Sequence, residues 1–173
     1  MTRNTSVRSF SPEEWPIYRA LRLQALEESP NAFGSTLTME LERTDNAWTE
    51  RLKNAVSSGQ DCAFLAEFAG TPSGLVWAKA DPNDPSTVHI LQMWVAPSAR
   101  GRGVGDTLLK AAILWAQQYG ARSAKLGVTC GDTSAVRLYQ RAGFVELGAP
   151  EPIRPGSALL AQNMVLALEE SAV

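Results

Sequence analysis

The sequence predicts an α/β protein with a mixed sheet, and three observations lead to that prediction. Its 173 residues fit one domain, because a domain typically holds about 100–200 residues. Segments with helical spacing of apolar residues interleave with short apolar runs typical of strands. Two pairs of strands look like hairpins, which makes part of the sheet antiparallel. We therefore expect a single domain over residues 1–173.

In the first half of the chain we expect a strand, two helices, a hairpin and a long strand. Ser11 and Pro12 mark the start of the first helix, which stops near Glu28 because Ser29-Pro30 cannot extend it. The other expected ranges are a first strand at 7–10, a loop at 30–38, a second helix at 40–57, hairpin strands at 63–68 and 74–78, and a central strand at 88–95.

In the second half, a glycine-rich loop leads into a strong amphipathic helix. One face of this helix carries apolar residues at steps of four, four, three and four, and Gly120 closes it; these residues are Val104, Leu108, Ala112, Trp115 and Tyr119. The remaining expected elements are a strand at 125–129, a short helix at 133–141, and strands at 144–147 and 159–168 around a Pro-rich loop.

Composition excludes several classes of protein. Sixteen Lys and Arg against eighteen Asp and Glu give a net charge of −2, which argues against nucleic acid or an anionic membrane as a partner. Two cysteines and one histidine predict neither a disulfide framework nor a metal site. Residues 1–10 are polar, and no run approaches the roughly 20 apolar residues of a membrane span. We expect a cytoplasmic, metal-free protein.

Residues 100–105, Arg-Gly-Arg-Gly-Val-Gly, lie between an apolar strand and an amphipathic helix. A helix N-terminus has about four unpaired N–H groups and a partial positive charge, so it attracts phosphate. Glycines let the backbone curve around an anion, and arginines add donors. Asp106 replaces the third glycine of a Rossmann fingerprint, and no Lys follows Gly105 as in a Walker A loop. The segment predicts a pyrophosphate site; the alternative is a turn whose glycines serve only geometry.

Two stretches carry a resemblance to a known family. Residues 91–97 (LQMWVAP) followed by residues 100–105 resemble the acetyl-coenzyme A (acetyl-CoA) motif of the GCN5-related N-acetyltransferases, the GNAT family. Residues 132–144 (DTSAVRLYQRAGF), about forty residues further on, are similar to the family's second signature. The order of expected elements agrees with the family along nearly the whole chain.

This resemblance implies a three-layer fold with a central, mostly antiparallel, splayed sheet of about six to seven strands and about four helices. It implies acetyl-CoA as cosubstrate, without a metal, and a pantetheine arm held by main-chain groups beside the open strand. Asp132 departs from the Asn that often begins the second signature. The expected cofactor-binding residues are Met93, Trp94, Val95, Arg100, Gly101, Arg102, Gly103, Val104, Gly105, Asp106, Asp132, Ala135 and Tyr139.

Acetyl transfer to an amine needs a proton for the departing thiolate and a donor for the oxyanion. Tyr139 is the expected general acid, because a phenol of pKa about 10 is still protonated near neutrality. The alternative is a core tyrosine whose hydroxyl bonds to the backbone. The N–H of Val95 is expected to meet the oxyanion.

The reaction also needs a base, because an alkyl ammonium of pKa about 10.4 is almost wholly charged at neutral pH. His89 is the expected base, on the same face of its strand as Leu91 and Met93. The alternative is a surface histidine at a strand start. Glu67 and Glu40 are further candidates.

Loops 30–38 and 150–157 are expected to form the acceptor site. Phe33 would wall a pocket, Arg154 would bind an acidic group and Ser157 would donate or accept a hydrogen bond; loop packing is the alternative for each. The expected reaction is direct transfer to a primary amine in a ternary complex, with Cys130 as the alternative acyl carrier. The resemblance implies a small-molecule, protein or peptide acceptor and allows a homodimer. The sequence leaves open the acceptor, the base, the oligomeric state and the use of other acyl groups.

Two other functions compete with this one. The first is a non-catalytic acyl-CoA-binding sensor of the same fold, in which Asp132 and the absence of a carboxylate on the central strand reflect lost chemistry. The second is a nucleotide-binding α/β protein.

Overall fold

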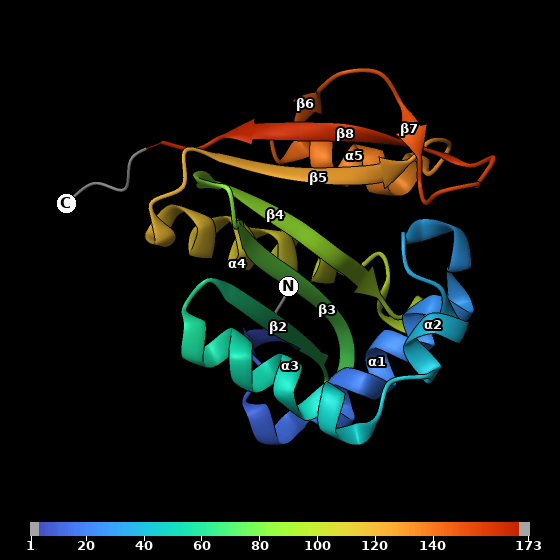
Figure 1. The fold of residues 1–173 in the computed structure, drawn as a ribbon, viewed down its shortest axis with the longest axis vertical. Coiled ribbons are helices and arrows are strands. Elements are labelled where there is room, and N and C mark those ends of the chain that lie inside the picture. The colour runs from blue at the N-terminus through green and yellow to red at the C-terminus, as the bar shows by residue number, and fades with distance from the viewer. Residues whose placement is uncertain (1–3, 170–173) are drawn as a thin grey trace.

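The computed structural model describes residues 4–169 as an eight-stranded sheet covered by helices on both faces (Figure 1). The strands are β1 (Thr5–Ser9), β2 (Asp61–Phe68), β3 (Thr71–Asp81), β4 (Asp84–Val95), β5 (Ser123–Thr129), β6 (Val145–Glu146), β7 (Glu151–Pro152) and β8 (Leu160–Ala167). The helices are α1 (Trp15–Glu28), α2 (Leu37–Leu41), α3 (Asp45–Ser58), α4 (Val104–Tyr119) and α5 (Thr133–Arg141), with single 3₁₀ turns η1 (Pro12–Glu14), η2 (Pro30–Ala32) and η3 (Pro97–Ala99). The strand order is β1-β2-β3-β4-β5-β8-β6, and β7 pairs with β8.

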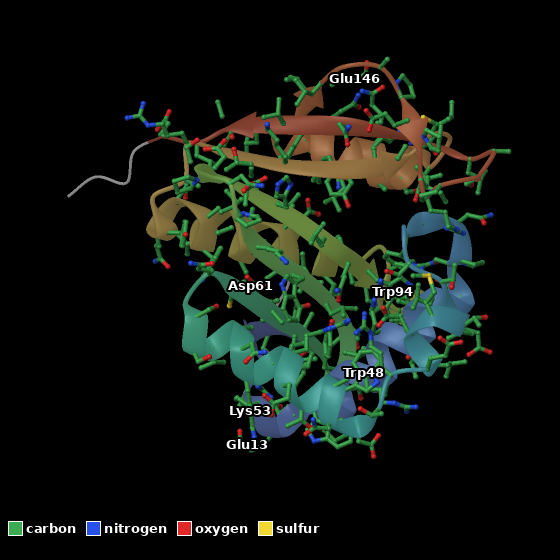
Figure 2. The ribbon with its side chains drawn as sticks, in the orientation of Figure 1. Glu13, Trp48, Lys53, Asp61, Trp94 and Glu146 are labelled. Atoms are coloured by element: carbon green, nitrogen blue, oxygen red, sulfur yellow. The ribbon has the colours of Figure 1, made fainter. Side chains whose placement is uncertain are left out.

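Two separate hydrophobic clusters show that the sheet is the middle of three layers. One cluster joins the sheet to α4 and α5 and includes Leu108, Leu109 and Tyr139. The other joins the opposite face to α1 and α3 and includes Trp48 and Trp94, both of which are labelled in Figure 2. The expected three-layer α/β fold is confirmed.

The sheet opens between β4 and β5. These neighbours are the one parallel pair in the described sheet, and they pair only where residues 87–89 meet residues 123–125. Beyond that point β4 runs on to Val95 and β5 runs on to Thr129 without a shared ladder, so the strands diverge (Figure 1). The expected splay is therefore present, and His89 lies at its apex.

A bulge in β4 changes which residues face the two layers. The register against β3 shifts by one residue near Gln92, whose φ of 58° is in the left-handed region. The Tyr18 hydroxyl donates a hydrogen bond to Gln92 Oε1 at 2.7 Å and so holds this residue in place. Because of the bulge, Met93 packs on the α4 side. The expectation that Met93 shares a face with His89 and Leu91 is wrong for this reason.

Several element boundaries differ from the expected ones. The helix expected at 40–57 is two helices, because the Thr44 side chain accepts a hydrogen bond from the Ala47 N–H at 3.1 Å and starts α3 anew. Ala69 and Gly70, with φ of 50° and 79°, make a two-residue turn, so β2 and β3 are longer than expected. Strand β7 lies inside the expected Pro-rich loop. Among residues 4–169, no helix combines the length and apolar content that crossing a bilayer requires.

Candidate active site

A cleft of about 440 Å³ occupies the opening between β4 and β5. Its walls come from six elements far apart in sequence, together with the loop that follows α1. The lining includes Arg22 from α1, Gln92 and Met93 from β4, Thr129 from β5, Tyr139 from α5, Glu151 from β7 and Asn163 from β8. The cleft therefore exists because the sheet is splayed.

The glycine loop presents a row of free backbone donors beside this opening. Gly101 and Gly103 have φ of 74° and 80°, which glycine adopts without strain. The Arg100 N–H donates to the Pro97 carbonyl at 3.3 Å, and the next N–H with a backbone acceptor is that of Thr107, which donates to the Gly103 carbonyl at 3.1 Å. Among the described residues, the N–H groups of residues 102–106 have no acceptor. Free donors and the positive end of α4 fit a diphosphate.

The C-terminal end of β4 directs backbone groups into the opening. The Ala96 N–H donates to the Ser73 carbonyl at 2.7 Å, so Ala96 pairs with β3. Because backbone groups alternate along a strand, those of Val95 point away from β3. Arg100 Nε donates to the Val95 carbonyl at 2.9 Å, which leaves the Val95 N–H as the free donor of this residue.

The side chains expected to bind cofactor have protein partners instead. Arg100 donates to both carboxylate oxygens of Glu28, at 3.1 and 2.7 Å, and this guanidinium lowers the pKa of Glu28 to about 2. Arg102 stacks over the Phe68 ring at 5.2 Å.

The two expected acidic residues are also engaged. Asp106 pairs with Arg141 at 3.4 Å. Asp132 caps α5 by accepting from the Ala135 N–H at 3.3 Å. The donors left for a diphosphate are therefore the backbone N–H groups of residues 102–106 and the Arg102 guanidinium, whose N–H groups have no acceptor among the described residues.

Tyr139 reaches the cleft from the buried face of α5. Its ring is 7% exposed and meets Phe144 edge to face at 6.0 Å. Its hydroxyl has no hydrogen-bond partner among the described residues, unlike that of a core tyrosine bonded to the backbone. Burial, with a smaller contribution from the negative charge of Asp132, raises the pKa of Tyr139 above its usual 10. The phenol is thus a proton donor at neutral pH.

The expected bases lie elsewhere. His89 Nε2 is 2.7 Å from Asp81 Oδ2, and His89 is not among the residues that line the cleft. Glu67 pairs with Arg8 at 3.2 Å. Glu40 is 3% exposed and accepts from Arg43 at 3.0 Å and from Arg51 at 3.4 Å.

Residues of the loop after α1 line the cleft, and Figure 1 shows this loop beside the end of β5. Phe33 lines the cleft and is 8% exposed. Arg154 does not line it; its Nη1 donates to the Phe33 carbonyl at 3.0 Å and ties the two acceptor loops together. The Thr129 hydroxyl donates to the Asn31 carbonyl at 2.7 Å and fixes the same loop to β5.

Sequence reasoning did not assign a role to several polar residues that line the cleft, among them Arg22, Gln92 and Glu151. Arg22 had a signal in the sequence, since it is a charged residue four positions after Tyr18 on the apolar face of a helix. Glu151 fell in a segment interpreted as a loop. The bulge at Gln92 had no sequence signal.

Comparisons with known proteins agree with this geometry. The pattern of the family described as "Acetyltransferase (GNAT) family" matches residues 17–144. A mycothiol acetyltransferase from Thermobispora bispora is 30% identical over 143 residues, 80% of this chain and 45% of that protein. The chain spans less than half the length of the first curated relatives that it matches.

Solved structures match over nearly the full chain. An acetyltransferase of the GNAT family from Streptococcus pneumoniae has a TM-score of 0.81 and 25% identity, over 95% of this chain and 99% of that one. An acetyltransferase from Salmonella typhimurium, solved with its cofactor acetyl-CoA, has a TM-score of 0.77 at 19% identity, over 99% and 98% of the two chains.

Proposed function

The chain belongs to the GNAT family of acetyltransferases, and on that premise we propose that it transfers an acetyl group from acetyl-CoA to a primary amine. The observation that carries the proposal is the row of free N–H groups at residues 102–106, next to the opening beside β4. A diphosphate there would receive several backbone hydrogen bonds and the positive end of α4. Every helix leaves about four N–H groups unpaired at its start, so the support for a ligand is the position of these groups beside the opening between β4 and β5 together with the family match.

Each step of the chemistry has a group in this chain. Acetyl-CoA supplies the activated acyl group as a thioester. The Val95 N–H donates a hydrogen bond to the acyl oxygen as negative charge develops on it. The Tyr139 hydroxyl gives its proton to the departing sulfur, and its raised pKa keeps that proton in place until it is needed.

Two groups compete for the role of base. Glu151 is favoured, because it is the one carboxylate among the described residues that line the cleft. His89 is the rival, because it lies at the apex of the splay and its contact with Asp81 at 2.7 Å fixes the orientation of the ring. A water molecule would have to connect His89 to an amine in the cleft.

Direct transfer is favoured over a covalent route. Neither cysteine lines the cleft. Burial raises the pKa of Cys62 to about 11, and this residue lines a different pocket. Cys130 is exposed just beyond the end of β5. A Cys130→Ala variant is therefore expected to keep its activity.

The experiment combines titration calorimetry with acetyl-CoA and a thiol-release assay with a panel of amines. We expect binding heat with acetyl-CoA, and thiol release that depends on the amine. Binding heat without thiol release for any amine would favour the acyl-CoA sensor. Stabilisation by NAD or ATP but not by acetyl-CoA would favour the nucleotide-binding alternative and overturn the proposal.

A further inference from the structure

Arg22 is a buried cation that the protein leaves without a partner. It is 3% exposed on the inner face of α1 and lines the cleft. Its Nε and Nη1 atoms are buried and have no hydrogen-bond partner among the described residues. Burial lowers the pKa of this guanidinium, since the surrounding protein does not fully replace the lost water. Buried polar groups are nearly always hydrogen-bonded, so this one needs an explanation.

The nearby carboxylate does not supply the missing partner. Glu40 already accepts hydrogen bonds from Arg43 and Arg51. Together with Arg22, this group has three positive charges against one negative charge, and no ion pair joins Arg22 to a described carboxylate. Phe33 contributes a cation–π contact, with its ring centre 4.8 Å from the Arg22 guanidinium carbon. That contact orients the guanidinium plane but leaves its N–H groups unsatisfied.

We propose that the acceptor is a small amine that carries a carboxylate, such as an α-amino acid, and that Arg22 binds this carboxylate. This inference rests on the proposed transferase function and names its substrate class. A carboxylate bound in the cleft would satisfy the free N–H groups of Arg22. It would also place the amine of the same molecule within the space that Tyr139 and Glu151 line.

The charges of the cleft fit a zwitterion better than other ligands. Among the described residues that line it, Arg22 and Glu151 are the only charged ones. One guanidinium matches one carboxylate in charge, and its planar pair of N–H groups can bond both carboxylate oxygens. A phosphate carries up to two negative charges and would meet a single cation here. An amine without an anionic group would leave Arg22 buried and unpaired.

The test compares L-amino acids with their own carboxamides in the thiol-release assay. A carboxamide keeps the amine and the side chain but loses the negative charge. We expect kcat/KM to be about tenfold or more higher for the preferred carboxylate than for its carboxamide. The carboxamide has the less basic amine, so an enzyme that ignored the carboxylate would acetylate the carboxamide faster. Taurine and aminomethylphosphonate test whether a sulfonate or phosphonate is preferred, which would overturn the carboxylate assignment.

Arg22→Met is the principal variant, because it keeps the length of the side chain and removes the charge. We expect the ratio of carboxylate to carboxamide rates to fall to about one, mainly through KM. Arg22→Lys keeps the charge but loses the fork, so part of the preference should survive. Lys53→Met is the matched control for loss of one cation. The Lys53 side chain is 58% exposed on α3 and, within residues 4–169, pairs only with Glu50, at 3.8 Å. Figure 2 shows it at the end of the molecule opposite Glu146.

A second measurement does not depend on catalysis. Millimolar N-acetylglycine should raise the melting temperature of the wild type but not of Arg22→Met, and N-acetylglycinamide should raise neither. The melting temperature of Arg22→Met itself should equal or exceed that of the wild type, because an unpaired buried charge is removed.

Three results would overturn the inference. The first is an equal ratio of carboxylate to carboxamide rates in the wild type and Arg22→Met. The second is faster acetylation of carboxylate-free amines by the wild type. The third is an unchanged rate ratio in Arg22→Lys together with a large fall in the melting temperature of Arg22→Met. The last result would make Arg22 a structural residue. Absence of acetyl-CoA binding heat and of thiol release with every amine would instead overturn the transferase proposal itself, so the two failures are distinguishable.

Discussion

The two sides of the proposed active site are built in different ways. The proposed cofactor side consists of backbone donors from one short stretch, residues 102–106, which lie beside the cleft at the end of β4. The proposed acceptor side consists of side chains from distant segments that line the cleft: Arg22 from α1, Phe33 from the following loop and Glu151 from β7. Backbone donors would recognise the diphosphate, a feature that every acyl-CoA shares. Side chains can be substituted one at a time, so the ligand of the acceptor side can change while the backbone donors of the cofactor side stay the same.

The two sides also differ in how their charges are satisfied. On the cofactor side, Arg100 and Asp106 are ion-paired, and Arg102 stacks over the Phe68 ring. On the acceptor side, Arg22 has buried N–H groups without partners. Paired side chains hold a loop in shape, whereas an unpaired buried charge favours a ligand of opposite sign. Residues on the α1 side are therefore the ones to test for substrate specificity.

The largest expected effect belongs to the group that lies between the two sides. Tyr139→Phe should lower kcat by about 100-fold, because the departing thiolate loses its proton donor. The acetyl-CoA dissociation constant measured by calorimetry should change little. The pKa of Tyr139 is raised, so its proton is retained above the usual pKa of 10, and any loss of wild-type activity through this group should begin only above about pH 10.

Tyr119→Phe is the matched control for this substitution. Tyr119 stacks on Trp115 at 5.3 Å in α4, and its hydroxyl has no hydrogen-bond partner in the described part of the chain. It should keep wild-type kcat. Unchanged kcat in Tyr139→Phe would remove this residue from the acid role.

The next effect tests the acceptor side. Glu151→Gln should lower kcat/KM by about 100-fold, because the amine loses its proton acceptor. His89→Gln should leave kcat/KM near the wild-type value. The reverse pattern would assign the base to His89 and would leave Glu151 as a charged residue of the cleft wall.

The residues of the proposed cofactor side are far easier to find in the sequence than those of the proposed acceptor side. Residues 100–105 are contiguous, and their glycines and the helix after them are local features that a sequence displays. The splay and the position of Tyr139 followed from a family resemblance. Arg22 and Glu151, by contrast, meet only because the fold brings α1 and β7 to the same opening. The sheet face on which Met93 lies was mispredicted, because one bulged residue, Gln92, reverses the faces of the residues after it.

A smaller effect separates backbone geometry from ligand binding on the cofactor side. Gly101 and Gly70 have nearly the same left-handed conformation, with φ of 74° and 79°, and a Cβ atom at either position meets open space. Alanine should strain both positions by about 1–2 kcal/mol. Gly101→Ala should weaken acetyl-CoA binding by about tenfold in calorimetry, whereas Gly70→Ala, in the β2–β3 turn, should leave it unchanged. Equal affinities for the two variants would mean that the loop does not hold the diphosphate.

The smallest expected effect tests the hydrogen bonds of Tyr18, which join the two sides. The Tyr18 hydroxyl donates to Gln92 Oε1 and accepts from Arg51 Nη1 at 3.3 Å, so it connects α1 and α3 to the bulge of β4. Tyr18→Phe leaves the Gln92 oxygen without this donor and should lower stability by about 1–2 kcal/mol, or roughly 2–8 °C in melting temperature. Because the bulge sets the direction of the backbone groups after Gln92, the KM for acetyl-CoA should also rise a few-fold, and Tyr119→Phe should change neither quantity. A loss of stability with an unchanged KM would show that the fold holds the bulge without Tyr18, and that the cofactor side is independent of the α1 side.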